Sequence, residues 1–176
     1  MDFQELIKIR QSDRAYENRT VEREKIETVL NAGRLAPSAN NAQSWTFIVV
    51  DESELKNRVA DACFRVGGDF VKQAPVVIAL VAEKPTLISR LGVAIRQIDF
   101  TSLDMGIVAA HLCLQAADLG LGSCMLESFN EEKVRQALNI PDNRRLALLI
   151  SLGYSADKQR EKKRKKIEDV VRWNGY

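Results

Sequence analysis

PVVIALVA, residues 75–82, is the longest strongly apolar run of the chain, and it decides the fold class. A continuous apolar run that opens on a proline is typical of a β-strand buried on both faces of its sheet. The run is too short to cross a lipid bilayer, so it predicts no membrane span. We therefore expect a sheet whose central strand is fully covered.

Further strands and helices are expected on either side of this run. The β-rich segments 46–50 and 146–153 predict two more strands, and 123–126 is a shorter candidate. Apolar residues at helical spacing predict helices over 2–10, 21–35, 53–64, 93–119 and 131–138. Residues 66–73 are expected to be irregular. Strands set among helices favour an α/β or α+β sandwich.

Polar residues mark where three of these helices begin. Thr20 is the expected N-cap of the helix over 21–35, and Asn130 that of the helix over 131–138. Asp51 and Glu54 form a capping-box pattern before the helix over 53–64.

The expected helix 93–119 is apolar around most of its circumference and ends at Gly120, a residue suited to a helix C-cap. Such a helix lies either at the centre of a core or in a large subunit interface. It contains His111, the single histidine, which we expect to be packed or at an interface rather than catalytic.

Composition excludes several classes of protein. The 176 residues suit one domain over 1–176, and the net charge of +2 gives no general case for a nucleic-acid partner. Cys63, Cys113 and Cys124 lack a CxxC pair, so we expect neither a disulfide framework nor a metal site. The N-terminal residues do not have the pattern of a secretory signal, and we expect a cytoplasmic protein with no membrane attachment.

Three polar or basic clusters contain the candidate ligand-binding residues. Arg10, Ser12 and Arg14 lie within five residues, and guanidinium groups match phosphate oxygens in bidentate pairs. Residues 37–45 (PSANNAQSW) carry amides that suit the uracil-like edge of a flavin or the hydroxyls of its sugar-alcohol chain. Residues 158–166 hold seven basic residues and one Glu. Each cluster alone also has a structural explanation: an exposed helix end, a capped loop and a solvated charge run.

Taken together, in this order and at this spacing, the clusters resemble the nitroreductase family of flavoproteins. The matching motifs span nearly the whole chain and are Arg10-x-Ser12-x-Arg14-x-Tyr16, Ala36-Pro37-Ser38-x-x-Asn41-x-Gln43-x-Trp45, Ala74-Pro75-Val76-Val77, Leu119-Gly120-Leu121-Gly122-Ser123-Cys124 and Lys162-x-Arg164. The resemblance implies an α+β, three-layer sandwich in which helices flank a central mixed, mostly antiparallel sheet. It also implies a homodimer with the long central helix at its seam. Residues 158–176 are then a basic tether and a C-terminal arm exchanged with the partner subunit.

The resemblance implies FMN as the cofactor. In this family the first motif grips the phosphate and the ribityl chain, a role that falls on Arg10, Ser12 and Arg14. The late basic pair Lys162 and Arg164 contacts the phosphate in the family. Because Lys162 and Lys163 are adjacent, either could make the lysine contact. The partner subunit reaches the flavin with a loop whose matching residues here are Pro37, Ser38, Ala39, Asn41 and Gln43.

The implied reaction is a ping-pong hydride transfer. NADH or NADPH gives hydride to flavin N5 and leaves, and an electron-poor small molecule such as a nitroaromatic or a quinone then takes its place. The flavin supplies the chemistry while the protein supplies binding, orientation and electrostatics, so no side chain is expected to be an acid, base or nucleophile. The backbone of Glu127 is expected to face flavin N5.

Three positions depart from the family pattern. Gln11 stands where a second basic residue or His is common, Met125 where Pro is common, and Ser128 where Gly is common. These departures leave open one phosphate contact and the backbone path near Glu127. Two alternatives also stay open: another reaction on the same fold, such as reductive dehalogenation or flavin breakdown, or a non-catalytic flavin-binding dimer.

Overall fold

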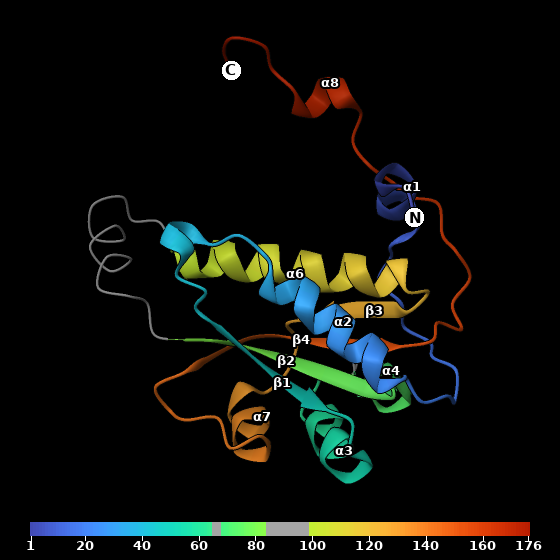
Figure 1. Ribbon diagram of the computed structural model, residues 1–176, viewed down its shortest axis with the longest axis vertical. Helices are drawn as coiled ribbons and strands as arrows, with labels where there is room; N and C mark the ends of the chain where they lie inside the picture. The colour runs from blue at the N-terminus through green and yellow to red at the C-terminus, as the bar shows by residue number, and fades with distance from the viewer. Residues whose placement is uncertain (65–67, 84–98) are drawn as a thin grey trace.

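A four-stranded sheet forms the centre of the molecule (Figure 1). The computed structural model describes residues 1–64, 68–83 and 99–176. The strands are β1 (Trp45–Val50), β2 (Val76–Ala82), β3 (Gly122–Leu126) and β4 (Arg145–Gly153), in the order β1-β2-β4-β3. Every neighbouring pair is antiparallel, and the parallel component within the described ranges is a single bridge between Ser12 and Ser123. The four expected strands and the mostly antiparallel sheet are thus confirmed.

The strand β2 is central, and all seven of its residues are buried, as its continuous apolar run predicted. It pairs with β1 on one side and β4 on the other, with a register shift between Leu80 and Val81. Its side chains alternate between two hydrophobic cores, because successive residues of a strand point to opposite faces. Val77 and Ala79 belong to one core, whereas Ile78 and Leu80 belong to the other.

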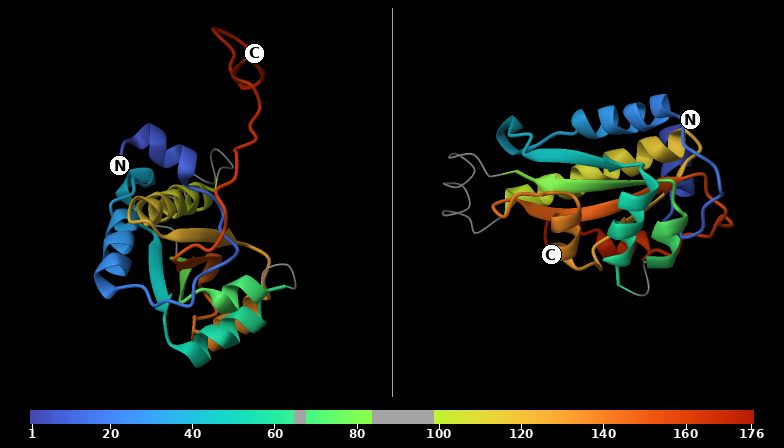
Figure 2. Two further views of the ribbon diagram at one scale, coloured as in Figure 1. Left: turned by 90° about the vertical axis from the view of Figure 1, so that its right-hand side faces the viewer. Right: turned by 90° about the horizontal axis from the view of Figure 1, so that it is seen from below.

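Helices cover both faces of the sheet and complete a three-layer sandwich (Figures 1 and 2). One face carries α2 (Arg23–Arg34) and α6 (Phe100–Asp118). The other face carries α3 (Ser53–Asp61), α4 (Gly68–Gln73) and α7 (Glu131–Ala137). The expected α+β sandwich is confirmed. Since both faces are covered, polar motifs are left at the edges of the sheet and at the ends of its strands.

The long helix α6 has two apolar faces. Its inner face is buried against the sheet and α2 through residues such as Val108 and Leu112. Leu103 and Ile107 on its outer face remain 56% and 36% exposed. α6 is long and apolar enough to pass a composition test for a membrane span, but the core helix of a globular protein passes the same test, so it does not indicate a membrane protein. Residues 93–98 of the expected helix lie outside the described residues.

One segment expected to be irregular is helical. Residues 66–73 contain α4, in which Val71 is fully buried and Phe70 is 7% exposed. Six residues are too few to show a helical period in sequence, and packing against α3 decides their conformation.

Two of the three expected caps are wrong. The N-cap of α3 is Glu52 rather than Asp51, because the longer side chain reaches back to the backbone N–H groups of Glu54 (2.8 Å) and Leu55 (2.6 Å). The N-cap of α2 is Glu22 rather than Thr20, and it makes no side-chain cap bond. Asn130 caps α7 as expected, accepting a hydrogen bond from the backbone N–H of Lys133 at 3.0 Å.

The two ends of the chain lie differently. The N-terminal helix α1 (Phe3–Ile9) packs near the C-terminal end of α6, where the Met1 amino group is 2.9 Å from a carboxylate oxygen of Asp118. After β4 the chain passes over residues 9–14 and then projects from the body, where it forms the short helix α8 (Ile167–Val170) (Figure 2). Trp173 in this arm is 86% exposed. Exchange of the arm with a partner stays a prediction.

Replacing Gly153 by Ala tests the packing at the end of β4. A Cβ atom there would lie 2.5 Å from Cδ of Pro75 and 3.0 Å from Cδ1 of Tyr16, and neither ring can rotate away. We expect Gly153→Ala to lower the free energy of unfolding by about 1–3 kcal/mol, a typical cost of overpacking. Denaturant unfolding measures this change. Gly175→Ala, whose Cβ meets nothing within 4 Å, is the control; equal stability of the two variants would contradict the packing described here.

Candidate functional site

The segment from Arg10 to Arg14 is held against the edge of the sheet. Ser12 forms a parallel bridge with Ser123 of β3, and the backbone N–H of Asp13 donates to the Ser123 carbonyl at 3.0 Å. Further along, the buried Tyr16 hydroxyl lies 2.7 Å from the Ser151 hydroxyl in β4. These bonds give a basic motif a rigid backbone at the free edge of β3.

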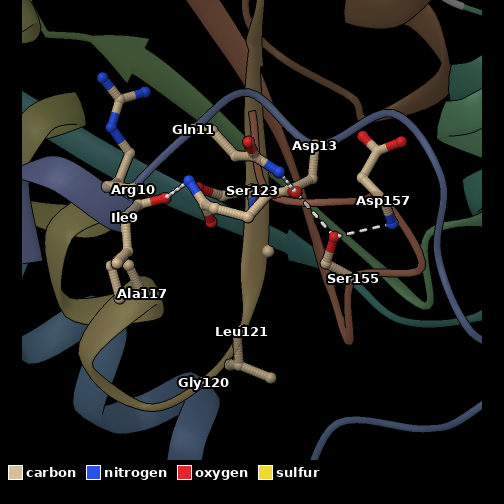
Figure 3. Close-up of a pocket in the computed structure, with 12 residues that line it drawn as sticks. Ile9, Arg10, Gln11, Asp13, Ala117, Gly120, Leu121, Ser123, Ser155 and Asp157 are labelled. Atoms are coloured by element: carbon tan, nitrogen blue, oxygen red, sulfur yellow. Dashed lines mark hydrogen bonds between the residues drawn. The ribbon is translucent and has the colours of Figure 1, made fainter. Parts of the chain in front are cut away.

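A buried carboxylate lies beneath this motif. Asp13 is 5% exposed and accepts hydrogen bonds from the Ser155 hydroxyl (2.6 Å), the Gln11 side-chain amide (2.9 Å) and the backbone N–H of Ser123 (3.3 Å) (Figure 3). A Cβ atom at Gly122 would come within 2.9 Å of the Asp13 carboxyl carbon. The glycine is therefore needed for the close approach of Asp13 to β3.

The basic segment after β4 crosses over the same motif. The backbone N–H of Arg14 donates to the Asp157 carboxylate at 2.6 Å, and this bond is the main cause that lowers the pKa of Asp157. The Gln159 side chain donates to the Ile9 carbonyl at 3.1 Å. The Lys162 ammonium donates to the Arg10 carbonyl. Segments from opposite ends of the sequence thus form one surface.

A cavity of about 640 Å³ opens between these two segments. Its lining residues are Arg10, Gln11, Ser12, Arg14, Arg160, Glu161, Lys162, Lys163 and Arg164. The structure therefore brings together five residues that the sequence assigned to one phosphate: Arg10, Ser12, Arg14, Lys162 and Arg164. The function of this cluster stays a prediction.

The cluster has an excess of positive charge. Among the described residues, no carboxylate lies within 4 Å of the guanidinium groups of Arg10 and Arg14, whereas Arg160 pairs with Asp157 at 3.2 Å. Loss of solvent lowers the pKa of Lys162, and the nearby charges of Arg10 and Arg164 lower it further. Cations that are grouped without a paired carboxylate are suited to bind an anion, and a phosphate dianion is such a group.

The second predicted set lies at the other end of α6. The loop holds the short 3-10 helix η1 (Ala39–Asn41), and its backbone N–H at Ala39 donates to the Asp104 carboxylate at 3.1 Å. Asn41 and Gln43 have φ angles of 53° and 47°, in the left-handed region. Non-glycine residues in that region are uncommon and often occur at functional sites. Pro37 and Ser38 lead into this turn, and the Ser38 hydroxyl accepts from the backbone N–H of Gln43 at 3.0 Å.

Within one chain the two sets are far apart. Asp104, which contacts the loop, and Ala117, which lies beside Arg10, are 13 positions apart on α6. At 1.5 Å per residue this is about 20 Å along the helix axis. Glu127 comes directly after β3, where it lines a cavity of about 310 Å³ with Gly106 and Arg145, near the Asp104 end of α6. The structure therefore assembles the basic cluster but not the complete predicted site.

Several residues of the site were not predicted from the sequence. Asp104 anchors the loop, Asp157 holds the backbone of Arg14, and Arg160 donates to the Ser12 carbonyl. A signal for Asp104 existed in the sequence, because it is the one acidic residue among the first 18 residues of a largely apolar helix. In the structure it is 5% exposed. No comparable pattern marks Asp157 or Arg160 within a run of charges.

Known proteins resemble this chain over nearly its full length. A nitroreductase family protein from Clostridium difficile 630 is 31% identical, covers 100% of both chains and has a TM-score of 0.85. An FMN-dependent nitroreductase from Clostridium difficile R20291 is 29% identical, covers 97% of this chain and 98% of its own, and has a TM-score of 0.81. The NADH dehydrogenase of Thermus thermophilus is 29% identical over 93% of this chain and 92% of its own.

A relative with a different named activity is also similar: the iodotyrosine deiodinase of Thermotoga neapolitana is 25% identical over 98% of this chain and 97% of its own. A family model described as Nitroreductase family matches residues 7–154, from within α1 to the residue after β4. That range contains the motif at Arg10–Arg14, the loop at Pro37–Gln43 and the whole sheet. This chain therefore belongs to the nitroreductase family.

Proposed function

We propose that this chain is an FMN-dependent oxidoreductase that passes hydride from NADH or NADPH to an electron-poor small molecule such as a nitroaromatic or a quinone. Its membership of the nitroreductase family makes it an oxidoreductase of that family. The observation that carries the cofactor assignment is the cluster of cations on one cavity, where Arg10 and Arg14 have no acidic partner among the described residues.

The cluster assigns a role to each phosphate-binding residue. The guanidinium groups of Arg10 and Arg14 and the Ser12 hydroxyl would hold the phosphate from one side, and Lys162 and Arg164 from the other. Of the two adjacent lysines, Lys162 is the better candidate, because its ammonium already lies against the Arg10 carbonyl. When bound, FMN supplies the hydride chemistry, and the chain orients it and excludes water. The backbone of Glu127 is assigned to the reacting edge of the flavin.

A homodimer would complete the site. The loop that holds Pro37, Ser38, Ala39, Asn41 and Gln43 is bonded to Asp104, which lies about 20 Å along α6 from Ala117 beside the basic cluster of the same chain. This spacing supports a site in which the loop and the cluster come from different subunits. The exposed apolar face of α6, with Leu103 and Ile107, supports a subunit seam that brings the partner's loop to this cluster. The exposed arm around Trp173 supports the proposed exchange of the C-terminal segment.

Reductive dehalogenation is the second candidate, and the similarity to a deiodinase favours it specifically. The same cofactor site would serve both reactions, so the fold does not separate them. The assay must therefore include a halogenated phenol beside a nitroaromatic and a quinone. We place the enzyme in the cytoplasm, since its three cysteines are buried free thiols, which suits a reducing compartment.

An absorbance spectrum of the purified protein tests the proposed function. We expect flavin bands that bleach when NADH or NADPH is added without oxygen and that recover when the acceptor is added. Bands that persist with both nucleotides would support a non-catalytic flavin-binding dimer instead. If no flavin binds even after FMN is added, the cofactor assignment is wrong.

Replacing Arg14 tests the phosphate cluster. Arg14→Ala removes a cation from the cavity, and a hydrogen bond between charged groups contributes roughly 1.5–3 kcal/mol, so FMN affinity should fall by about tenfold or more. Fluorescence titration of the apo-protein with FMN measures the change. Arg58→Ala, on the exposed surface of α3, is the matched control and should bind FMN like the unchanged protein.

Mixed dimers test whether two subunits build each site. In a dimer of an Arg10→Ala chain and an Asn41→Ala chain, one site carries both changes and the other carries neither. Random mixing makes half of the dimers mixed, so activity should recover to about a quarter of the unchanged protein. Mixing Arg10→Ala with Arg14→Ala should recover nothing, because both residues belong to the same half-site. Equal recovery in the two mixtures would refute the shared site.

A further inference from the structure

The side-chain amide of Gln11 connects the two segments that form the basic cluster. Its nitrogen donates to the Asp13 carboxylate at 2.9 Å and to the Lys158 carbonyl at 3.2 Å. Its oxygen accepts from the backbone N–H of Arg160 at 3.0 Å. Both ends of one amide are therefore used, and two of the three bonds go to the backbone of the basic segment.

The Gln11 side chain points away from the neighbouring cation. In Figure 3 it extends toward Asp13, whereas the side chain of Arg10 does not turn toward Asp13. Asp13 in turn is fixed by the Ser155 hydroxyl at 2.6 Å, and the backbone N–H of Asp157 donates to that hydroxyl at 3.1 Å. Gln11 thus belongs to a hydrogen-bonded chain that ends where the basic segment begins.

The residue type at this position has a chemical consequence. An Arg or Lys side chain has no acceptor, so it could not receive the hydrogen bond from the backbone N–H of Arg160. An amide offers a donor and an acceptor together, which lets Gln11 hold Lys158 and Arg160 at once. The path of the chain through these two residues sets where Lys162 and Arg164 arrive at the cavity.

We propose that Gln11 is a positioning residue, which fastens the basic segment 158–164 over the Arg10–Arg14 motif and thereby sets the preference of the site for a flavin that carries a phosphate. The inference rests on the proposed function, because it takes the cavity to be the phosphate site. Gln11 also lines the cavity, but the three hydrogen bonds of its amide go to protein groups, so it acts on the ligand through the segment that supplies Lys162 and Arg164.

The first experiment compares FMN with riboflavin, which has the same ring and chain but no phosphate. Affinities of the apo-protein for both are measured by fluorescence titration for the unchanged chain, Gln11→Ala, Gln11→Met and the control Gln136→Ala, an exposed helical glutamine. We expect Gln11→Ala to reduce the ratio of FMN to riboflavin affinity by about tenfold, the effect of one or two net hydrogen bonds. Gln11→Met keeps the length of the side chain but removes both the donor and the acceptor, and it should reduce the ratio by a similar factor. Gln136→Ala should leave it unchanged.

The second experiment needs no flavin. Trypsin cleaves after Lys and Arg, so the rate of cleavage within residues 158–166 of the apo-protein reports how firmly this segment is held. We expect faster cleavage in both Gln11 variants and no change in Gln136→Ala. Because Gln11→Met preserves the length of the side chain and adds no charge, it keeps the test decisive if Gln11→Ala does not fold.

The outcomes separate this inference from the proposed function. An unchanged affinity ratio together with unchanged cleavage would overturn the role of Gln11, whatever the cofactor. If the unchanged protein binds neither flavin, the proposed function fails, and the cleavage rates alone then decide whether Gln11 fastens the segment. A fall in both affinities by the same factor would show a general structural effect and would also overturn the proposed preference for phosphate.

Discussion

The buried carboxylate of Asp13 joins three segments that are distant in sequence. It accepts hydrogen bonds from Gln11 in its own motif, from Ser123 in β3 and from Ser155 after β4. Burying a carboxylate lowers the stability of the fold unless its oxygens accept hydrogen bonds. These three donors must therefore be in place together. The basic residues that flank Asp13 depend on the same arrangement, because the bridge between Ser12 and Ser123 and the hydrogen bonds of Asp13 together hold their backbone at the edge of β3. The position of the basic cluster therefore depends on the hydrogen bonds that the Asp13 carboxylate accepts.

The charges of the site divide into two groups with different tasks. Arg160 pairs with Asp157 and donates to the Ser12 carbonyl, which makes it part of the scaffold. Arg10 and Lys162 lie close to each other, and the pKa of Lys162 is lowered by burial and by that neighbouring charge. Bringing like charges together costs electrostatic energy, which an anion between them would recover. A site of this kind is arranged for its ligand before the ligand arrives.

Sequence predicted the fold where apolar residues are periodic or continuous. The run at Val76–Ala82 indicated a central strand, and the stripe on α6 indicated a helix with two apolar faces. It failed at α4, which is too short for periodicity, and at the cap of α3, where the choice between Asp51 and Glu52 depends on side-chain reach. For the candidate site, the basic residues that line the cavity could be named because their chemistry is visible in the motif. Asp104, Asp157 and the orientation of Gln11 could not, because their roles arise from contacts across 65 to 149 positions.

The pairing of the first and last parts of the chain has a consequence for synthesis. Arg10 and Arg164 line one cavity but are separated by 154 positions. A ribosome that adds roughly 5–20 residues per second needs about 8–30 s to pass from one to the other. During that interval the N-terminal motif exists without Ser155, Asp157 or the basic segment that completes it. Before β4 is made, β1 and β2 can pair, but β3 lacks the strand with which it pairs. The nascent chain therefore completes its sheet and its basic cluster together, near the end of translation.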